Sequence, residues 1–223
     1  MRHTKHTIVF ACILLSLLSA ASHATTRYVA AGGSGDGSSW ASPLGNIQTA
    51  INASSSGDEV WLKAYSDSSV YNQTFTLKEG VAVNGGYIGA YNGDTTRDTL
   101  ESPTYVTTIS ASGLSGAVVG AGNTISRSTL IEYCTLRDAS GTGCGIYMSS
   151  ASPTISHCRF VNNNAKGIYA DINSSPDIEN CYITGTNSSG LFWYKGICNN
   201  SKIYGNTSSS GGGVGLSVYI RRL

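Results

Sequence analysis

The carboxyl-terminal half of the chain repeats one short pattern about every two dozen residues. An isoleucine followed three positions later by a cysteine occurs three times at nearly equal steps: Ile131 with Cys134, Ile155 with Cys158, and Ile178 with Cys181. A glycine followed by an apolar residue recurs in the same phase, at steps just as regular, at Gly145, Gly167, Gly190 and Gly213. Two markers in one phase predict a solenoid, in which each repeat forms one coil stacked on its neighbours.

The residues inside each repeat favour short strands joined by tight turns. Apolar runs rich in Ile, Val, Tyr and Phe alternate with Ser, Asn and Gly, and no helical apolar stripe is present. Because strand faces alternate with a period of two, residues three positions apart cannot both point inward along one straight strand. A bend must therefore separate the isoleucine from the cysteine. The pattern predicts an all-β fold, a single-stranded parallel β-helix with roughly three strands per coil and ~4.8 Å between coils.

Equivalent side chains of successive coils should stack, so Cys134, Cys158 and Cys181 are expected to form one inward column. We expect Asn206 to end this structural ladder, because a fourth, more divergent copy keeps Ile203 and has Asn206 about one repeat length after Cys181. Side chains of one column point in parallel, which is poor geometry for a disulfide, so buried thiols are favoured. The spacing leaves the disulfide state of Cys144 and Cys198 open.

Residues 1–24 have the features of a secretory signal peptide. Arg2 and Lys5 precede an apolar run over residues 8–18, too short to span a membrane, and the small-x-small sequence Ser22-His23-Ala24 follows. We expect cleavage after Ala24, no transmembrane segment in the mature chain, and a secreted or outer-membrane surface location. Loss of Arg2 and Lys5 changes the formal charge from +1 to −1. No basic surface is evident in the remainder, which argues against nucleic acid as a partner.

The mature chain is predicted to comprise an amino-terminal segment, residues 25–56, and a series of coils, residues 57–223. The first segment holds a short strand, a glycine-rich loop, and a helix in which Ile47, Ala50 and Ile51 share one face behind an Asn46 N-cap. This helix is expected to cover the open end of the solenoid. Strands of the coils are expected at Val60-Trp61-Leu62 and near residues 74–77, 81–87, 105–109 and 124–131, with a polar excursion over residues 89–103.

Several motifs resemble those of a known group of proteins. They are Tyr28-Val29, Gly35-Asp36-Gly37-Ser38-Ser39-Trp40, Ile47-Gln48-x-Ala50-Ile51 and Gly57-Asp58-Glu59-Val60-Trp61. With them, the chain from about Arg27 to Gly213 resembles exported bacterial β-helix proteins of the pectin-lyase-like superfamily. Phe160-Val161-Asn162-Asn163 is similar to the Phe-x-x-Asn element of polymorphic outer-membrane protein repeats, and Gly211-Gly212-Gly213-Val214 is loosely similar to their Gly-Gly-Ala-Ile element. The resemblance implies a right-handed β-helix, a fold that hosts both enzymes and non-catalytic surface proteins.

Enzymes of that superfamily, by the same resemblance, hold calcium with clustered acidic side chains or cleave glycosidic bonds with paired carboxylates. Both need acidic residues from adjacent coils on one face. Glu132 and Glu179 share a phase, but Ser156 holds that phase in the coil between them, so their carboxylates are expected ~10 Å apart. His157, a candidate general base, has no acidic residue in its phase in the neighbouring coils. No catalytic residue is assigned, and no metal site is predicted.

The pattern therefore favours a non-catalytic adhesin, passenger or carbohydrate-binding scaffold without a cofactor, whose partner is a polysaccharide or a cell-surface glycan. The alternative is a polysaccharide lyase or glycosidase, and calcium is expected only in that case. Asp94, Arg97 and Asp98 of the excursion are candidate ligand-binding residues, although they can also pair within their own loop. Trp193 and Tyr194 are candidates because aromatic rings stack on sugars, although such rings also pack inward.

The repeat stops after Gly213-Val214 without a capping helix or a charged edge. An uncovered end exposes unpaired backbone groups and apolar side chains. The sequence thus predicts a truncated member of a longer family. The alternative is end-to-end self-association, which would bury the same surface.

Overall fold

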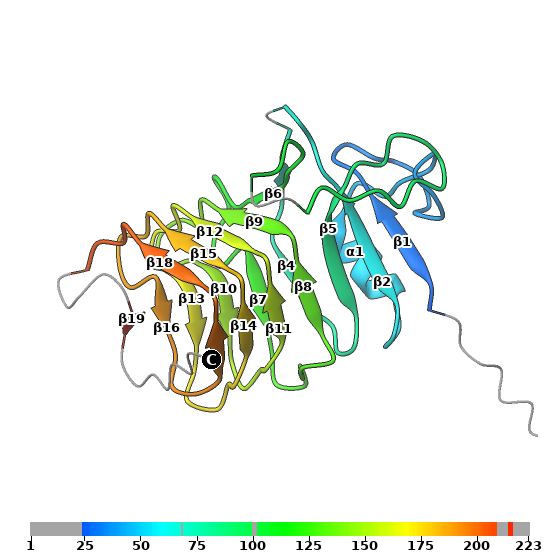
Figure 1. Cartoon of the computed structure of the whole chain (residues 1–223). Helices are drawn as coiled ribbons and strands as arrows, with labels where there is room; N and C mark the ends of the chain where they lie inside the picture. Colours follow the sequence, from blue (N-terminus) through cyan, green and yellow to red (C-terminus); the bar gives the residue numbers. More distant parts are fainter. Residues whose placement is uncertain (1–23, 68, 100–101, 209–213, 216–223) are drawn as a thin grey trace, which may run out of the picture.

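Parallel strands in three sheets build the protein (Figure 1). The computed structural model describes residues 24–67, 69–99, 102–208 and 214–215, so residues 1–23 of the predicted leader, the marker Gly213 and the end of the chain after Gly215 lie outside the described residues. The first sheet contains β1 (Thr26–Val29), β2 (Glu59–Lys63), β5 (Ala82–Tyr87), β8 (Leu130–Glu132), β11 (Thr154–Ser156), β14 (Asp177–Glu179) and β17 (Ile197–Asn199). The second contains β3 (Tyr71–Asn72), β6 (Thr107–Ser110), β9 (Cys134–Arg137), β12 (Arg159–Val161), β15 (Tyr182–Thr184) and β18 (Lys202–Tyr204). The third contains β4 (Phe75–Thr76), β7 (Val119–Ala121), β10 (Cys144–Met148), β13 (Lys166–Ala170), β16 (Leu191–Phe192) and β19 (Val214–Gly215).

After β1 the chain makes six coils, and each coil contributes one strand to every sheet in turn. Strands that neighbour one another in a sheet pair in parallel, and the repeats are in register. Ile155 pairs with Ile131 on one side and with Ile178 on the other, and Ile168 pairs with Ile146 and Leu191. The predicted all-β parallel β-helix with three strands per coil is confirmed.

One residue in the left-handed backbone region makes the bend between the first and second sheets. In the last four coils it is Tyr133, His157, Asn180 and Asn200, with φ values of 52°, 50°, 53° and 44°. In the first three of these coils this residue lies between the isoleucine and the cysteine of the repeat and lets both point inward. In the last coil Asn200 lies between Cys198 and Ser201. The bend that the three-residue spacing required is therefore a single αL residue, which costs an L-amino acid roughly 1–2 kcal/mol.

The core is a narrow stack of inward columns, one or two from each sheet. Burying one such aliphatic side chain contributes about 1.5–3 kcal/mol. In register along the three sheets, the columns are Val60, Val83, Ile131, Ile155, Ile178 and Cys198; Ile109, Leu136, Phe160, Ile183 and Ile203; and Phe75, Val119, Ile146, Ile168 and Leu191. Cys134, Cys158 and Cys181 form a further buried column at the start of the second-sheet strands.

The structure corrects the end of the cysteine column. Because β15 and β18 pair Tyr182 with Lys202, the residue that follows Cys181 in the column is Ser201, whose hydroxyl accepts the Cys181 amide hydrogen at 3.1 Å. Asn206 lies elsewhere, three residues after Ile203. Asn206 was misplaced because the last connection from the third sheet to the first sheet is shorter than the one before it. From Tyr169 to Asp177 the chain advances eight residues, whereas between their register partners Phe192 and Ile197 it advances five. The last repeat is three residues shorter than the pattern assumed.

Asn206 instead repeats the role of Asn163. The Asn163 side chain accepts from the Ala139 amide at 3.1 Å and donates to the Leu136 carbonyl at 3.0 Å. Asn206 makes the equivalent bonds two coils later, to the Thr186 amide and the Ile183 carbonyl, both at 3.1 Å. These internal amides satisfy backbone groups at the turn after the second sheet.

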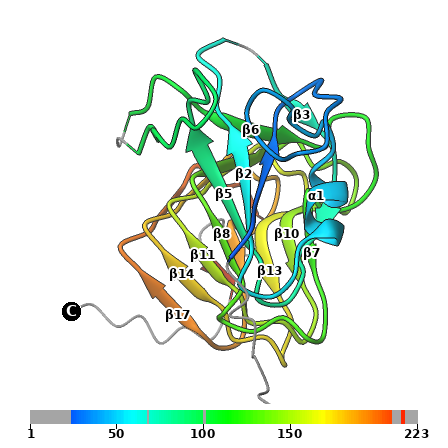
Figure 2. The same ribbon diagram turned by 90° about the vertical axis from the view of Figure 1, so that its right-hand side faces the viewer.

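The predicted helix forms as α1 (Ile47–Ala53), and the Asn46 side chain caps it by accepting from the Thr49 amide at 2.8 Å. Ile47, Ala50 and Ile51 are its buried residues. Figure 2, which looks onto the amino-terminal end, shows α1 beside β1 and β2 and in front of the later coils. The helix thus covers apolar side chains of the first coil, as expected.

Candidate functional site

The polar excursion between β5 and β6 is fastened to the coils by Arg97. Its Nε and Nη2 donate to the Gly85 carbonyl at 3.0 and 2.8 Å, and its Nη1 pairs with the Glu132 carboxylate at 2.6 Å. The guanidinium also lies over the rings of Tyr87 and Tyr133, at 4.8 and 4.5 Å from their centroids. The structure therefore places Arg97 in an internal junction and not in an open ligand site.

Asp94 shapes the excursion from inside. It is buried, and its carboxylate accepts the amide hydrogens of Thr96 at 2.9 Å and Ala90 at 2.8 Å. Hydrogen bonds from Thr96 and Ala90 lower the pKa of Asp94. The Asp94 carbonyl also accepts from the indole Nε1 of Trp40 at 2.6 Å. These contacts hold the excursion against the glycine-rich loop and leave Asp94 inaccessible to a ligand.

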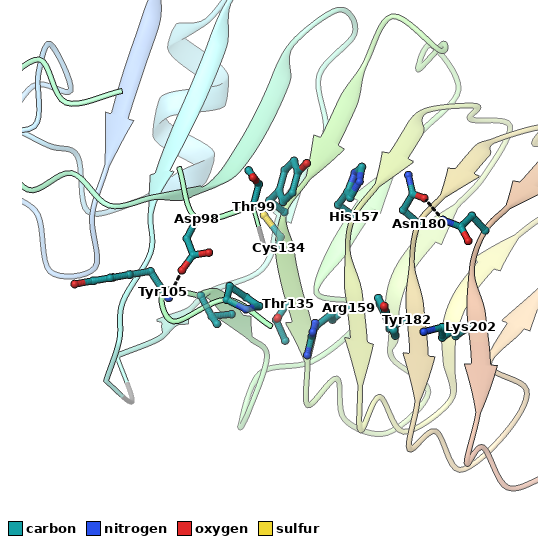
Figure 3. A pocket seen from close by; sticks show the side chains of 14 residues that line it. Asp98, Thr99, Tyr105, Cys134, Thr135, His157, Arg159, Asn180, Tyr182 and Lys202 are labelled. Atoms are coloured by element: carbon teal, nitrogen blue, oxygen red, sulfur yellow. Dashed lines mark hydrogen bonds between the residues drawn. The ribbon is translucent and has the colours of Figure 1, made fainter. Parts of the chain in front are cut away.

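Asp98, the third candidate of the excursion, lines a groove of about 360 Å³ along the second sheet (Figure 3). Its Oδ2 accepts the amide hydrogens of Thr104 at 2.7 Å and Tyr105 at 2.9 Å. The excursion forms one end of the groove, and two outward columns from the last four coils form its length. The columns are the bend residues Tyr133, His157, Asn180 and Asn200, and the strand residues Thr135, Arg159, Tyr182 and Lys202.

Side chains of the bend column pair along the groove. The rings of Tyr133 and His157 stack with centroids 4.6 Å apart and an angle of 9° between their planes. The Asn200 amide donates to the Asn180 side-chain oxygen at 2.6 Å. The column therefore has an aromatic half near the excursion and an amide half near the carboxyl end (Figure 3).

The strand column gives the groove its positive charge. Arg159 and Lys202 both lie over the Tyr182 ring, with the guanidinium carbon and the ammonium nitrogen 5.2 and 5.1 Å from its centroid. Cation–π contacts of this kind hold long side chains in place. Neither Arg159 nor Lys202 was predicted as a site residue. The available signal was that the position after each ladder cysteine is polar or aromatic in every repeat.

The carboxylates of the described repeats do not converge. In register on the first sheet, Ser156 separates Glu132 from Glu179, which puts them ~10 Å apart, and Glu132 is paired with Arg97. The exposed His157 has the Ser156 hydroxyl 2.8 Å from its Nδ1. These residues do not fit the calcium site or the carboxylate pair that the lyase or glycosidase alternative requires. Nowhere in the described ranges do three His, Cys, Asp or Glu side chains cluster as metal ligands would.

The outer face of the third sheet carries a ladder of stacked rings. Tyr147 and Tyr169 have centroids 4.9 Å apart at 7°, and Tyr169 and Phe192 lie 5.4 Å apart at 2°. The Lys166 ammonium lies 5.6 Å from the ring centroid of Tyr169 and 5.4 Å from that of Phe192. Tyr194, which the sequence singled out, is 44% exposed and packs edge-on against Phe192 at 5.6 Å. We call the stacked rings of Tyr147, Tyr169 and Phe192 the ring ladder, and Tyr194 lies at its border.

The structure does not support Trp193 as a ligand-binding residue. It is 1% exposed and belongs to the core between the sheets, so its ring cannot stack on a ligand at the surface. The alternation of inward and outward side chains explains the difference from its neighbours, because Phe192 and Tyr194 point out where Trp193 points in.

The five cysteines of the described ranges carry free thiols. Cys134, Cys158 and Cys181 are buried in their column, and burial raises the pKa of Cys134 to about 12 and those of the other two well above the ordinary value. Cys144 is buried and Cys198 is partly exposed. Cys198 pairs with Ile178, and its side chain therefore continues the isoleucine column.

Comparisons with known proteins agree with this architecture. A family model described as "Right handed beta helix region" matches residues 100–222, which is more than half of the chain. Searches of curated proteins and of solved structures found no match. Within the described residues, no helix is long and apolar enough to cross a membrane. Because the family match is this extensive and the coils have the corresponding topology, the protein belongs to the right-handed β-helix family.

Proposed function

We propose that this protein is an exported β-helix scaffold that binds a polysaccharide or a cell-surface glycan in the groove of the second sheet and does not cleave it. The groove itself carries the proposal. Its two outward columns repeat amide, hydroxyl, aromatic and cationic groups over four coils, with one step every ~4.8 Å.

A glycan offers what these columns can recognise. Sugar rings have apolar faces that stack on aromatic side chains and hydroxyl rims that bond with amides. The exposed ring of His157 lines the groove, and Asn180 and Asn200 supply amides. Arg159 and Lys202 add two cations, which favours a glycan that bears carboxylate or sulfate groups.

One observation supports binding without cleavage, and a second supports export. Asp98 is the one carboxylate among the described residues that line the groove, and it bonds the amides of its own loop. Hydrolysis by paired carboxylates requires a second acid within several ångströms. The predicted leader supports export, and the proposal places the mature chain outside the cell or on the outer-membrane surface.

The test is affinity electrophoresis of residues 25–223 through gels that contain neutral or acidic polysaccharides. We expect retardation by an acidic polysaccharide that weakens with salt. Tyr182→Ala removes the ring that holds Arg159 and Lys202 in place and should weaken binding roughly fivefold, which corresponds to about 1 kcal/mol. Tyr91→Ala is the matched control, because Tyr91 is 67% exposed and lies outside the groove.

Equal retardation of Tyr182→Ala and the parent chain would remove the groove from the proposal. The same polysaccharides, of pectic, alginate and chitin type, are incubated with the chain and calcium to look for new ends. A calcium-dependent rise in unsaturated product would support the lyase alternative instead.

A further inference from the structure

We propose a second binding site on the third sheet: a slot over Gly120 that takes the ring of a single sugar, such as the terminal unit of a glycan. The slot is a hollow of about 510 Å³ whose lining includes Thr76, Gly120, Thr142 and Tyr147. It lies on a different sheet from the groove and shares no residue with it. The site therefore stands independently of the function proposed above.

The slot is a gap in the ring ladder. Along the outer face of the third sheet the residues in register are Thr76, Gly120, Tyr147, Tyr169, Phe192 and Gly215. The three successive members Tyr147, Tyr169 and Phe192 carry rings, and the ring of Tyr169 is covered on both faces by its neighbours. Tyr147 has a ring partner on one side only, because the coil before it has glycine at the ladder position. Its other face borders the hollow, and Tyr147 is 45% exposed.

The gap has room for one ring layer. Thr76 and Tyr147 are two coils apart, a separation of about 10 Å between their backbones. A Cβ atom built on Gly120 would have its three nearest atoms, at 3.4 to 3.9 Å, in Phe75 and Thr76 of the preceding coil. A ring that stacks on Tyr147 would take the place where a side chain of residue 120 would lie.

The walls identify the ring as a sugar. Tyr147 offers one apolar face, while the rim is polar and includes the exposed residues Thr74, Thr76 and Thr142. Gln48 fixes the far wall, since its side chain accepts from the Thr76 amide at 2.7 Å and donates to the Thr76 carbonyl at 3.4 Å. One apolar face and a hydroxyl rim are the features of a pyranose, whereas a plain aromatic ligand would make no hydrogen bonds with the rim.

The probes are methyl glycosides of glucose, galactose, mannose and N-acetylglucosamine, added singly to residues 25–223. Saturation-transfer NMR should show transfer to ring protons of at least one glycoside. Gly120→Tyr should fill the gap and reduce binding at least tenfold, with thermal unfolding to confirm that the variant is folded. Tyr91→Ala is the control and should keep binding, because Tyr91 is exposed and does not line the hollow. Tyr147→Ala, which removes the stacking wall without adding bulk, should also abolish transfer.

Transfer that persists at full strength in Gly120→Tyr, or its absence for all four glycosides with the parent chain, would overturn the proposal. Binding of phenol or indole in preference to every glycoside would also overturn it. Retardation by polysaccharide gels is measured on the same variants. Retardation that survives in Gly120→Tyr but not in Tyr182→Ala assigns polysaccharide to the groove, so failure of one site is distinguishable from failure of the other.

Discussion

At the scale of single residues, the αL positions show how the coil turns. Asn162 occupies such a position after the second sheet, with φ of 53°, and is exposed outside the groove. Asn162→Val puts a β-branched side chain into this conformation and should lower the free energy of unfolding by about 1–2 kcal/mol. Asn162→Gly should leave it near the parent value or raise it slightly. Urea unfolding measures both, and equal effects of the two variants would contradict the backbone explanation.

The cysteine column makes a prediction about reactivity. The thiolate is the reactive form, and burial raises the pKa of Cys134, Cys158 and Cys181, so little thiolate is present at neutral pH and reagents cannot reach it. Thiol labelling of the native chain should modify the partly exposed Cys198 first and the three column cysteines only after denaturant is added. Mass spectrometry of peptides reports each site. Rapid labelling of all three column cysteines in the native state would refute the buried column.

At the scale of elements, the glycine at the second position of β10 and of β13 has a steric cause. A Cβ atom at Gly167 would lie 2.3 Å from Ile183 Cγ2 and 2.7 Å from the Gly190 carbonyl oxygen, and one at Gly145 would lie 2.6 Å from the Gly167 carbonyl oxygen. Each glycine therefore lets the next coil approach. Gly167→Ala should destabilise the fold by about 1–3 kcal/mol. Thermal unfolding checks this against Gly120→Ala, which should change little, and a similar melting temperature for the two would contradict it.

The two repeat markers were enough to predict the strands on which they lie, and the observed register confirms these strands. It did not reveal β3, β7 or β18 in their places. Strands of two or three residues, such as Tyr71–Asn72 and Val119–Ala121, give too little alternation to stand out. Asn206 was misassigned because a three-residue shortening of one turn shifts the phase without changing the residue types. A period defines a column only while every turn keeps its length.

The sites were harder to predict than the fold. The groove depends on the excursion folding back beside coils that are distant in sequence, and no local pattern encodes that contact. The sequence does contain a signal for the slot over Gly120. Val119-Gly120-Ala121 pairs with Ile146-Tyr147-Met148, so a glycine stands at the position where the next coil has a tyrosine. Recognising it required the register of β7, which the repeat did not supply.

At the scale of the whole molecule, Arg97 joins the excursion to the coils and so sets one end of the groove. The side chain combines two bonds to the Gly85 carbonyl, an ion pair with Glu132 and two ring contacts. Its exposed fraction is 20%, against 17% for Glu132. A partly buried planar guanidinium that makes all of these contacts is not replaceable by lysine.

We expect Arg97→Lys to lower the free energy of unfolding by roughly 2–3 kcal/mol and to make the excursion cleavable between residues 94 and 105 under limited proteolysis. Arg127→Lys is the control, since Arg127 also pairs with a carboxylate, Asp177 at 2.7 Å, but is 50% exposed. Exposed pairs contribute about 0–1 kcal/mol, so the control should lose little stability and keep the excursion intact. If both variants lost the same stability, or if proteolysis began in the coils instead of the excursion, the Arg97–Glu132 contact would be an ordinary surface ion pair. The groove would then owe its end wall to other contacts, such as the bonds of Asp98 to Thr104 and Tyr105.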